Sequence, residues 1–231
     1  MKNKCVLITG SSKGLGEELA LVFASNKHDI ILHGRNKEDL RRVKEKISKL
    51  GVNCHVLAGD LRSDKTIEEL YKLAKGKDAS VLINNAGVDL KLQDAGTDLK
   101  LPLNEIDDKQ IEEILITNLI APIKLTKRLY TLFLDKGYGT IININSLSGL
   151  ENQKLKSVYC ASKWGLRGFT DTFRLEAEKH KVRVLGVYPS RIKTKPYFTF
   201  GMEPQEVSQK IYAAYKNAGI SEIKIDGRPK K

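Results

Sequence analysis

The sequence has few cysteines, prolines and aromatic residues, and it has no long hydrophobic run. Its three cysteines, Cys5, Cys54 and Cys160, lack the spacing of a disulfide framework or a zinc site, so we expect free thiols and no metal. Neither a proline-rich nor a low-complexity stretch divides the chain, which favours one domain over residues 1–231. No apolar run can span a bilayer, and Met1-Lys2-Asn3-Lys4 does not begin a signal peptide. These absences indicate a soluble cytoplasmic protein without a membrane partner.

The net charge of +12 raises the question of a nucleic-acid partner. The lysines are spread along predicted helix faces with acidic residues between them, as in Lys37-Glu38-Asp39. We therefore expect a solvated surface and no nucleic-acid partner, with some attraction for an anionic cofactor or substrate. The histidines match no ligand pattern, and we expect His28, His33, His55 and His180 at the surface or at strand ends.

Short apolar runs alternate with segments that repeat apolar residues at helical period. This alternation predicts an α/β protein, a single-domain Rossmann-type fold with a doubly wound parallel sheet and helices on both faces. The predicted strands are residues 5–8, 29–33, 53–57, 80–83, 140–144, 182–187 and 222–225, and the predicted helices are residues 17–25, 38–50, 65–75, 107–133, 158–179 and 206–217.

A glycine-rich turn joins the first predicted strand to the first predicted helix. Glycines at three positions permit a tight turn and let a pyrophosphate approach backbone N–H groups at a helix amino terminus, where the helix dipole favours negative charge. The strand before it and the helix after it make this a dinucleotide site rather than a surface turn. The candidate cofactor contacts in the turn are Gly10, Ser12, Lys13, Gly14, Leu15 and Gly16.

The end of the second predicted strand favours NADP(H) over NAD(H). The position that often carries a ribose-binding carboxylate is Gly34, so no acid there repels a 2′-phosphate. Arg35 follows and can hold that phosphate in charge-assisted hydrogen bonds, and Lys13 can add a second positive charge. The alternative is that both are ordinary solvated cations.

Ser146, Tyr159 and Lys163 have the spacing of a proton-transfer site. A free tyrosine has a pKa of about 10 and is a poor base at neutral pH, so it needs a nearby cation to stabilise its phenolate. Lys163 lies four residues after Tyr159 in a predicted helix and therefore on the same face. Ser146 can hydrogen-bond the oxygen that Tyr159 protonates and stabilise its developing charge. Singly, these residues also fit a surface pair and a loop hydroxyl, and Ser148 is the serine most easily confused with Ser146.

These motifs, in this order, resemble the short-chain dehydrogenase/reductase family along nearly the whole chain. The glycine turn matches TGxxxGxG, residues 159–163 match YxxxK, and Ser146 lies thirteen residues before Tyr159, which is the family's spacing. Gly34, Arg35 and Lys13 match NADP-preferring members. The other matching residues are Asp60-Leu61, Asn84-Asn85-Ala86-Gly87, Asn118, Pro189 and Thr194.

The resemblance implies reversible hydride transfer between a nicotinamide and a carbonyl or alcohol, with roles for the matching residues. It implies that Asn118 holds a water that links Lys163 to solvent, and that Thr194 contacts the nicotinamide carboxamide. The residues that it adds to the cofactor site are Asp60, Leu61, Asn85, Ala86, Gly87, Tyr159, Lys163, Pro189 and Thr194.

Some segments depart from the family pattern. Ser190 stands where the family usually has glycine, residues 88–102 are longer than usual, and residues 194–206 are shorter than the usual substrate lid, which suggests an open pocket. Members usually associate through the two long helices, so the resemblance implies a homodimer or homotetramer. The short tail after residue 225 puts the tetramer contacts that many members build from this end in doubt.

The resulting hypothesis is an NADP-dependent ketone or aldehyde reductase, and a ketoreductase of acyl-carrier substrates is its closest variant. Arg191, Lys193 and Lys195 could meet an acidic substrate, although a solvated basic loop is the simpler interpretation. The alternative from another class is a nucleotide-sensing, non-catalytic regulator or scaffold of the same family. Sugar-nucleotide epimerases need a longer chain and a different glycine spacing. The sequence does not identify the substrate, the stereochemistry or the direction.

Overall fold

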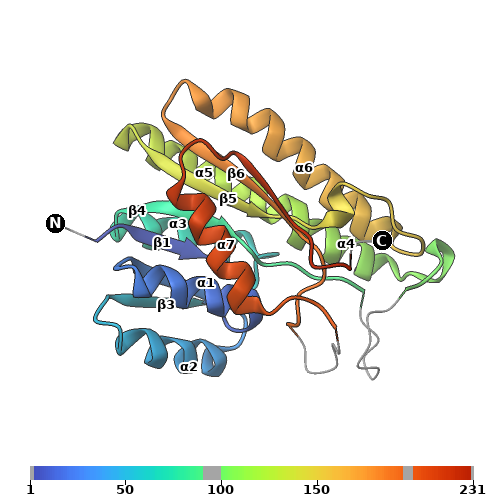
Figure 1. The fold of residues 1–231 in the computed structure, drawn as a ribbon, viewed down its shortest axis with the longest axis horizontal. Coiled ribbons are helices and arrows are strands. Elements are labelled where there is room, and N and C mark those ends of the chain that lie inside the picture. The colour runs from blue at the N-terminus through green and yellow to red at the C-terminus, as the bar shows by residue number, and fades with distance from the viewer. Residues whose placement is uncertain (1–2, 91–99, 195–199, 230–231) are drawn as a thin grey trace.

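A seven-stranded parallel sheet forms the centre of the protein (Figure 1). The structure is a computed structural model and describes residues 3–90, 100–194 and 200–229. The strands lie in the order β3-β2-β1-β4-β5-β6-β7, and all neighbouring strands are parallel. The strands are β1 (Cys5–Ile8), β2 (Asp29–Gly34), β3 (Cys54–Ala58), β4 (Ala79–Asn84), β5 (Gly139–Ile144), β6 (Val182–Pro189) and β7 (Glu222–Ile225).

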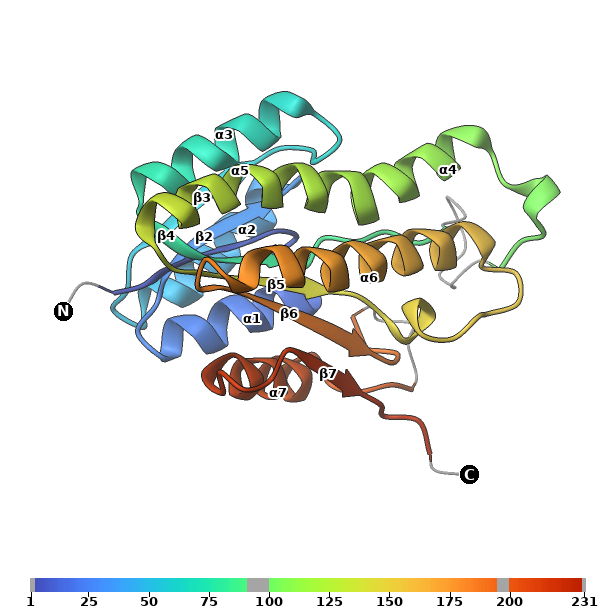
Figure 2. The same cartoon turned by 90° about the horizontal axis from the view of Figure 1, so that it is seen from above.

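Helices cover both faces of this sheet, which makes three layers (Figure 2). One face carries α1, α2 and α7, and the other carries α3, α5 and α6. The helices are α1 (Gly14–Ser25), α2 (Lys37–Ser48), α3 (Asp64–Gly76), α4 (Asp108–Leu115), α5 (Ala121–Lys136), α6 (Ser157–Glu178) and α7 (Pro204–Lys216). The doubly wound parallel fold predicted from the sequence is therefore confirmed.

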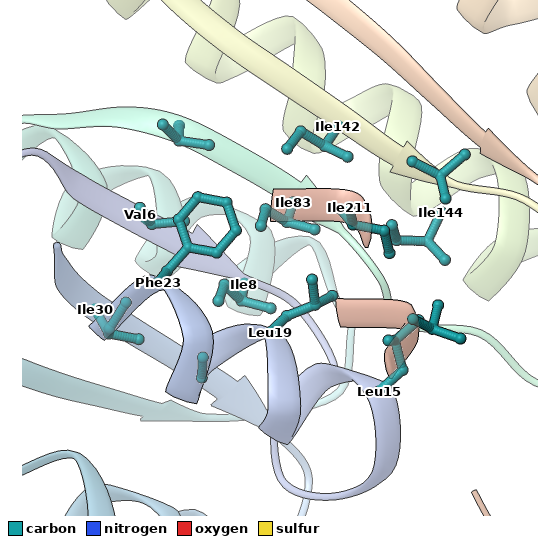
Figure 3. Packing of buried hydrophobic residues seen from close by; sticks show 14 of the residues in the cluster. Val6, Ile8, Leu15, Leu19, Phe23, Ile30, Ile83, Ile142, Ile144 and Ile211 are labelled. Carbon is teal, nitrogen blue, oxygen red and sulfur yellow. The ribbon is translucent and has the colours of Figure 1, made fainter. Parts of the chain in front are cut away.

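Alternate side chains along the strands pack into two hydrophobic cores, one on each face of the sheet. Val6 and Ile8 of β1 pack with Leu19 and Phe23 of α1 on one face (Figure 3), whereas Leu7 packs on the other face. Successive side chains of a strand point to opposite faces, so a strand buried on both faces must be apolar throughout. That requirement explains the uninterrupted apolar runs of the sequence.

The sheet reverses its winding at β1. The chain passes from β1 to β2 and β3 on one side, and then crosses back so that β4 pairs with the other side of β1. In open α/β sheets a crevice forms outside the carboxyl ends of the strands at such a reversal. Here those ends lead into the glycine turn and into Asn85-Ala86-Gly87, which places the two motifs side by side.

The predicted helix at residues 107–133 is interrupted at its centre. Between α4 and α5 lies a π-helical segment, η2 (Ile116–Ile120), which contains Asn118. Pro122 follows two residues after this segment, and proline has no N–H for the i−4 carbonyl, which here belongs to Asn118. Pro122 was the sequence signal for this interruption. Among the described residues, no helix is long and apolar enough to cross a membrane.

Candidate active site

The turn after β1 contains two glycines at positions that tolerate no side chain. Gly10 has φ +64°, and a Cβ on it would lie 2.8 Å from the Cα of Ala86. A Cβ on Gly16 would lie 2.1 Å from the Gly10 carbonyl oxygen, closer than atoms can approach. These glycines therefore allow the turn to fold back on α1 and on the segment after β4.

Hydrogen bonds fasten the glycine turn to that segment. The Asn85 side-chain amide donates to the carbonyls of Thr9 and Gly10, at 2.9 and 3.0 Å. The Thr9 Oγ1 accepts from the backbone N–H groups of Asn85 and Ala86, at 3.0 and 3.1 Å. The two motifs thus form one rigid floor of the crevice, and Thr9 is a structural member that the sequence prediction did not single out.

His33 supports the floor from the end of β2. It lies at a strand end as expected, but it is buried, as is His28. Its Nδ1 accepts from the Gly10 N–H at 3.4 Å, and its Nε2 lies 3.1 Å from the Gly59 carbonyl, which it can reach only as a donor. Burial lowers the pKa of His33 to about 4, although the Gly59 carbonyl and Asp60 oppose this. The ring is therefore neutral at physiological pH and joins three chain segments.

The amino terminus of α1 is open toward the crevice. Lys13 is its N-cap residue and its side chain makes no capping hydrogen bond. Thr194 lies over this end, because a Cβ on Gly14 would be 3.1 Å from the Thr194 methyl. Thr194 follows β6, whose last residue Pro189 is buried. The first N–H groups of a helix have no partner within the helix, so this end of α1 suits an anion.

A cavity of about 490 Å³ beside the end of β3 is lined by Asp60, Arg62, Ser63, Lys109, Glu112, Glu113 and Ile116. The Arg62 guanidinium binds the Asp60 carboxylate with Nη2–Oδ2 at 2.7 Å and lowers the pKa of Asp60. Glu113 of α4 lies 3.6 Å from Arg35 and 3.9 Å from Arg62. Arg62 was missed from the sequence, although its position two residues after Asp60 was a usable signal. Lys13 is exposed, Ser12 is half-buried and Leu61 is buried.

Lys163 is the most deeply buried cation of the crevice. Only 4% of it is exposed, its Nζ donates to the Ile144 carbonyl at 3.2 Å, and the same Nζ lies 5.7 Å from the centre of the Tyr159 ring. Burial lowers the pKa of Lys163 to about 8, and the negative charge of Asp89 limits this fall. Holding the Lys163 ammonium beside the Tyr159 phenol therefore lowers the stability of the folded protein.

Asn118 lies next to Lys163 and Gly87. A Cβ on Gly87 would be 3.5 Å from Asn118 Oδ1 and 3.7 Å from Lys163 Nζ. The Asn118 Nδ2 donates to the Val88 carbonyl at 2.8 Å and to Ser162 Oγ at 3.1 Å, while its Oδ1 accepts from the Val88 N–H at 2.8 Å. Both amide hydrogens are therefore used, and a water at Asn118 would have to donate to one of its oxygens.

Ser146 caps a short 3-10 turn, η3 (Leu147–Gly149), that packs on α6. Its Oγ accepts from the Ser148 N–H at 3.1 Å and lies 3.2 Å from Ser148 Oγ. Ser146 is half-buried whereas Ser148 is buried, so Ser146 is the serine accessible to a ligand. The Asn145 side chain donates to the Lys163 carbonyl at 3.0 Å and ties this loop to the helix of Tyr159 and Lys163.

Other expected features gave mixed results. Lys193 is paired with Glu203 at 2.8 Å, and Arg191 lies over the Phe200 ring at 4.4 Å. The Ser190 Oγ accepts from the Gly227 N–H at 2.9 Å, so this serine anchors the C-terminal segment. Most of the long loop after residue 88 lies outside the described residues, as does the part of the expected substrate lid at residues 195–199, which includes Lys195. All three cysteines have free thiols as expected.

The fold and the crevice define a protein of the Rossmann-type dinucleotide-binding class. The family model described as short chain dehydrogenase matches residues 4–198, and the chain belongs to this family of oxidoreductases. It is 29% identical to the ketoacyl reductase HetN of Nostoc sp., covering 99% of this chain and 80% of that protein. It is 33% identical to an NADP-dependent 3-hydroxy acid dehydrogenase of Schizosaccharomyces pombe, covering 84% of this chain and 74% of that protein.

Solved structures give the same assignment. A metagenomic short-chain oxidoreductase in complex with NADP superposes with a TM-score of 0.85 at 27% identity, over 98% of both chains.

Proposed function

We propose that this protein is an NADP(H)-dependent oxidoreductase that transfers a hydride between the nicotinamide and a carbonyl or alcohol, with Tyr159 as the general acid/base. The burial of the Lys163 ammonium 5.7 Å from the Tyr159 ring carries the proposal. Burying an ammonium is unfavourable, so its position beside a phenol calls for a functional explanation. Lys163 and Asn118 lie near Gly87, which follows β4, and ligands of such folds bind outside the carboxyl ends of the strands.

The crevice fits a dinucleotide. Uncapped N–H groups of α1 suit the pyrophosphate, Asp60 and Leu61 adjoin the adenine end, and Asn85, Ala86 and Gly87 would line the middle. When bound, the cofactor supplies or accepts the hydride. Pro189 and Thr194 would adjoin the nicotinamide.

NADP is favoured by charge at the end of β2. No acid replaces Gly34 there, and Arg35, which is exposed and lies 3.6 Å from Glu113, would bind a 2′-phosphate. Lys13 and Arg62 add further positive charge at this end of the crevice. The relatives named for NADP dependence or solved with NADP support the same choice.

Four residues of the chain would handle the proton. Lys163 stabilises the Tyr159 phenolate, so that Tyr159 donates its proton to a carbonyl during reduction and removes one from an alcohol during oxidation. Ser146 donates a hydrogen bond to the same substrate oxygen. Asn118 would hold a water through its backbone carbonyl, whose ordinary i+4 donor is absent because residue 122 is proline. That water would connect Lys163 to solvent.

A carbonyl-substrate screen with NADPH and NADH in parallel tests the proposal. Because two relatives are named a ketoacyl reductase and a 3-hydroxy acid dehydrogenase, 3-oxo acids and 3-oxoacyl thioesters belong in the screen beside simple ketones and aldehydes. We expect oxidation of NADPH with at least one class. Cofactor binding without turnover across the panel would instead support a nucleotide-sensing regulator.

We also propose a homodimer or homotetramer through the outer faces of α5 and α6. Leu134 on α5 and Trp164 and Leu175 on α6 are large apolar side chains exposed in the single chain. Light scattering should show a multiple of the chain mass, and Leu175→Glu should lower it. A monomer at all concentrations would refute this part.

A further inference from the structure

A second buried lysine lies beside Tyr159. Lys156 is 7% exposed, and its Nζ lies 5.3 Å from the centre of the Tyr159 ring, slightly closer than Lys163 Nζ. Lys156 is the N-cap residue directly before α6, three residues before Tyr159, and Lys163 follows Tyr159 by one turn within α6. The ring is therefore flanked along the helix by two ammonium groups.

The position of Lys156 is unfavourable for a cation. It is the N-cap residue of α6, where the helix dipole repels positive charge, and it is withdrawn from water. No hydrogen bond from its side chain caps the helix. Lys156 therefore gives no benefit to the helix that would explain a buried charge at this position.

Asp89 offsets that cost. Its Oδ2 lies 2.6 Å from Lys156 Nζ, and the two side chains are 18% and 9% exposed. Asp89 lies next to Val88, whose backbone N–H and carbonyl both hydrogen-bond the Asn118 side-chain amide. The pair thus joins the segment after β4 to the start of α6, across 67 residues of sequence.

Two described ammonium groups lie 5.3 and 5.7 Å from the centre of the Tyr159 ring. They belong to Lys163 of α6 and to Lys156, the N-cap residue before α6, and Asp89 of the segment after β4 is bound to Lys156. Asp89 also favours the charged form of Lys163. One carboxylate thus supports two cations.

We infer that Lys156, held by Asp89, is a second positioning residue that makes the Tyr159 phenol more acidic. The inference rests on the proposed function, in which Tyr159 transfers the proton. An ammonium near a phenol favours its ionised form, and a cation within about 4–6 Å changes a pKa by about one unit or more. Lys156 touches the reaction only through Tyr159.

A tyrosine titration of the cofactor-free protein tests this inference. The near-ultraviolet absorbance of phenolate is followed against pH, and the same titration of the matching Tyr159→Phe protein is subtracted, which isolates Tyr159. Lys156→Gln should raise the pKa of Tyr159 by about one unit, because it removes a cation and leaves Asp89. Lys156→Arg keeps the charge and should leave the pKa nearly unchanged.

Controls separate this electrostatic role from a purely structural one. Lys154→Gln removes an exposed lysine from the same loop and should leave the titration unchanged. If Lys156→Gln does not fold, Asp89→Asn with Lys156→Gln replaces the ion pair by two amides and should still raise the pKa, by less. An unchanged Tyr159 pKa in the variant that folds, or an equal change in Lys156→Arg, would overturn the inference.

The titration needs neither cofactor nor substrate, so it gives a result even if no turnover is found. Where turnover is found, the pH at which reduction declines should rise in Lys156→Gln by the same amount as the titrated pKa. A fall in activity with an unchanged pH profile would show only a structural role for Lys156.

Discussion

Replacing Lys163 by methionine should make the protein more stable while removing its activity. Lys163 is buried, and burial lowers its pKa from 10.5 to about 8. Each pH unit between the folded and unfolded pKa corresponds to about 1.4 kcal/mol, so keeping this lysine protonated at neutral pH costs the folded state about 3 kcal/mol. Lys163→Met also loses the Lys163–Ile144 hydrogen bond, which lowers the stability of the variant by about 1 kcal/mol. The net increase in its free energy of unfolding is therefore about 2 kcal/mol.

The pH dependence of this gain identifies its cause. Between the folded pKa of about 8 and the unfolded value of 10.5, the unfolded chain binds a proton that the folded protein does not, so wild-type stability rises with pH. Lys163→Met lacks this rise. The stability difference between the two proteins should therefore be constant below pH 8 and shrink above it.

Urea unfolding at several pH values from neutral to alkaline measures the difference. Lys127→Met, which replaces an exposed lysine of α5, is the matched control and should change stability by less than about 0.5 kcal/mol. A Lys163→Met protein that is less stable than wild type at pH 7, or a difference that does not change with pH, would refute the reasoning.

Three further predictions concern other charged groups. Burial lowers the pKa of His33 to about 4, so between about pH 6.5 and 4 the unfolded chain binds a proton that the folded protein does not. The free energy of unfolding should therefore fall by about 3 kcal/mol over this range. Urea titrations of His33→Gln should lack this loss. Burial opposes ionisation of Glu17, but Arg42 and Lys46 outweigh it and lower its pKa, so Glu17→Gln should lessen the loss of stability below about pH 4.5 in acid unfolding. Arg35→Ala should reduce the kcat/KM ratio of NADPH to NADH by about 10-fold or more, and an unchanged ratio would exclude a phosphate contact.

The strands, the helices and the motif residues could be predicted because they are local. Apolar runs and helical periods indicate burial on two faces, and the glycine turn occupies eight consecutive residues, 9–16. The hydrogen bonds between the Asn118 side chain and the Val88 backbone could not be predicted in this way, since they join positions 30 residues apart. The π-helical segment of the long helix had a local signal in Pro122. The apolar residues around Pro122 recur at helical period, so the sequence predicted one uninterrupted helix.

Buried charges were the least predictable feature. A lysine in the sequence reads as a solvated cation, and only the fold shows that Lys156 is buried against Asp89. The burial of His33 likewise follows from its place between the glycine turn and Gly59. Such pairs depend on segments that meet only after the sheet has formed.

The most direct test of the central claim compares Tyr159→Phe with Tyr138→Phe in the NADPH assay. Tyr138 is exposed on the surface, so its loss of a hydroxyl is a matched control. We predict that Tyr159→Phe keeps its fold and its cofactor affinity but loses turnover by about 100-fold or more, while Tyr138→Phe retains it. Undiminished turnover by Tyr159→Phe would contradict the account.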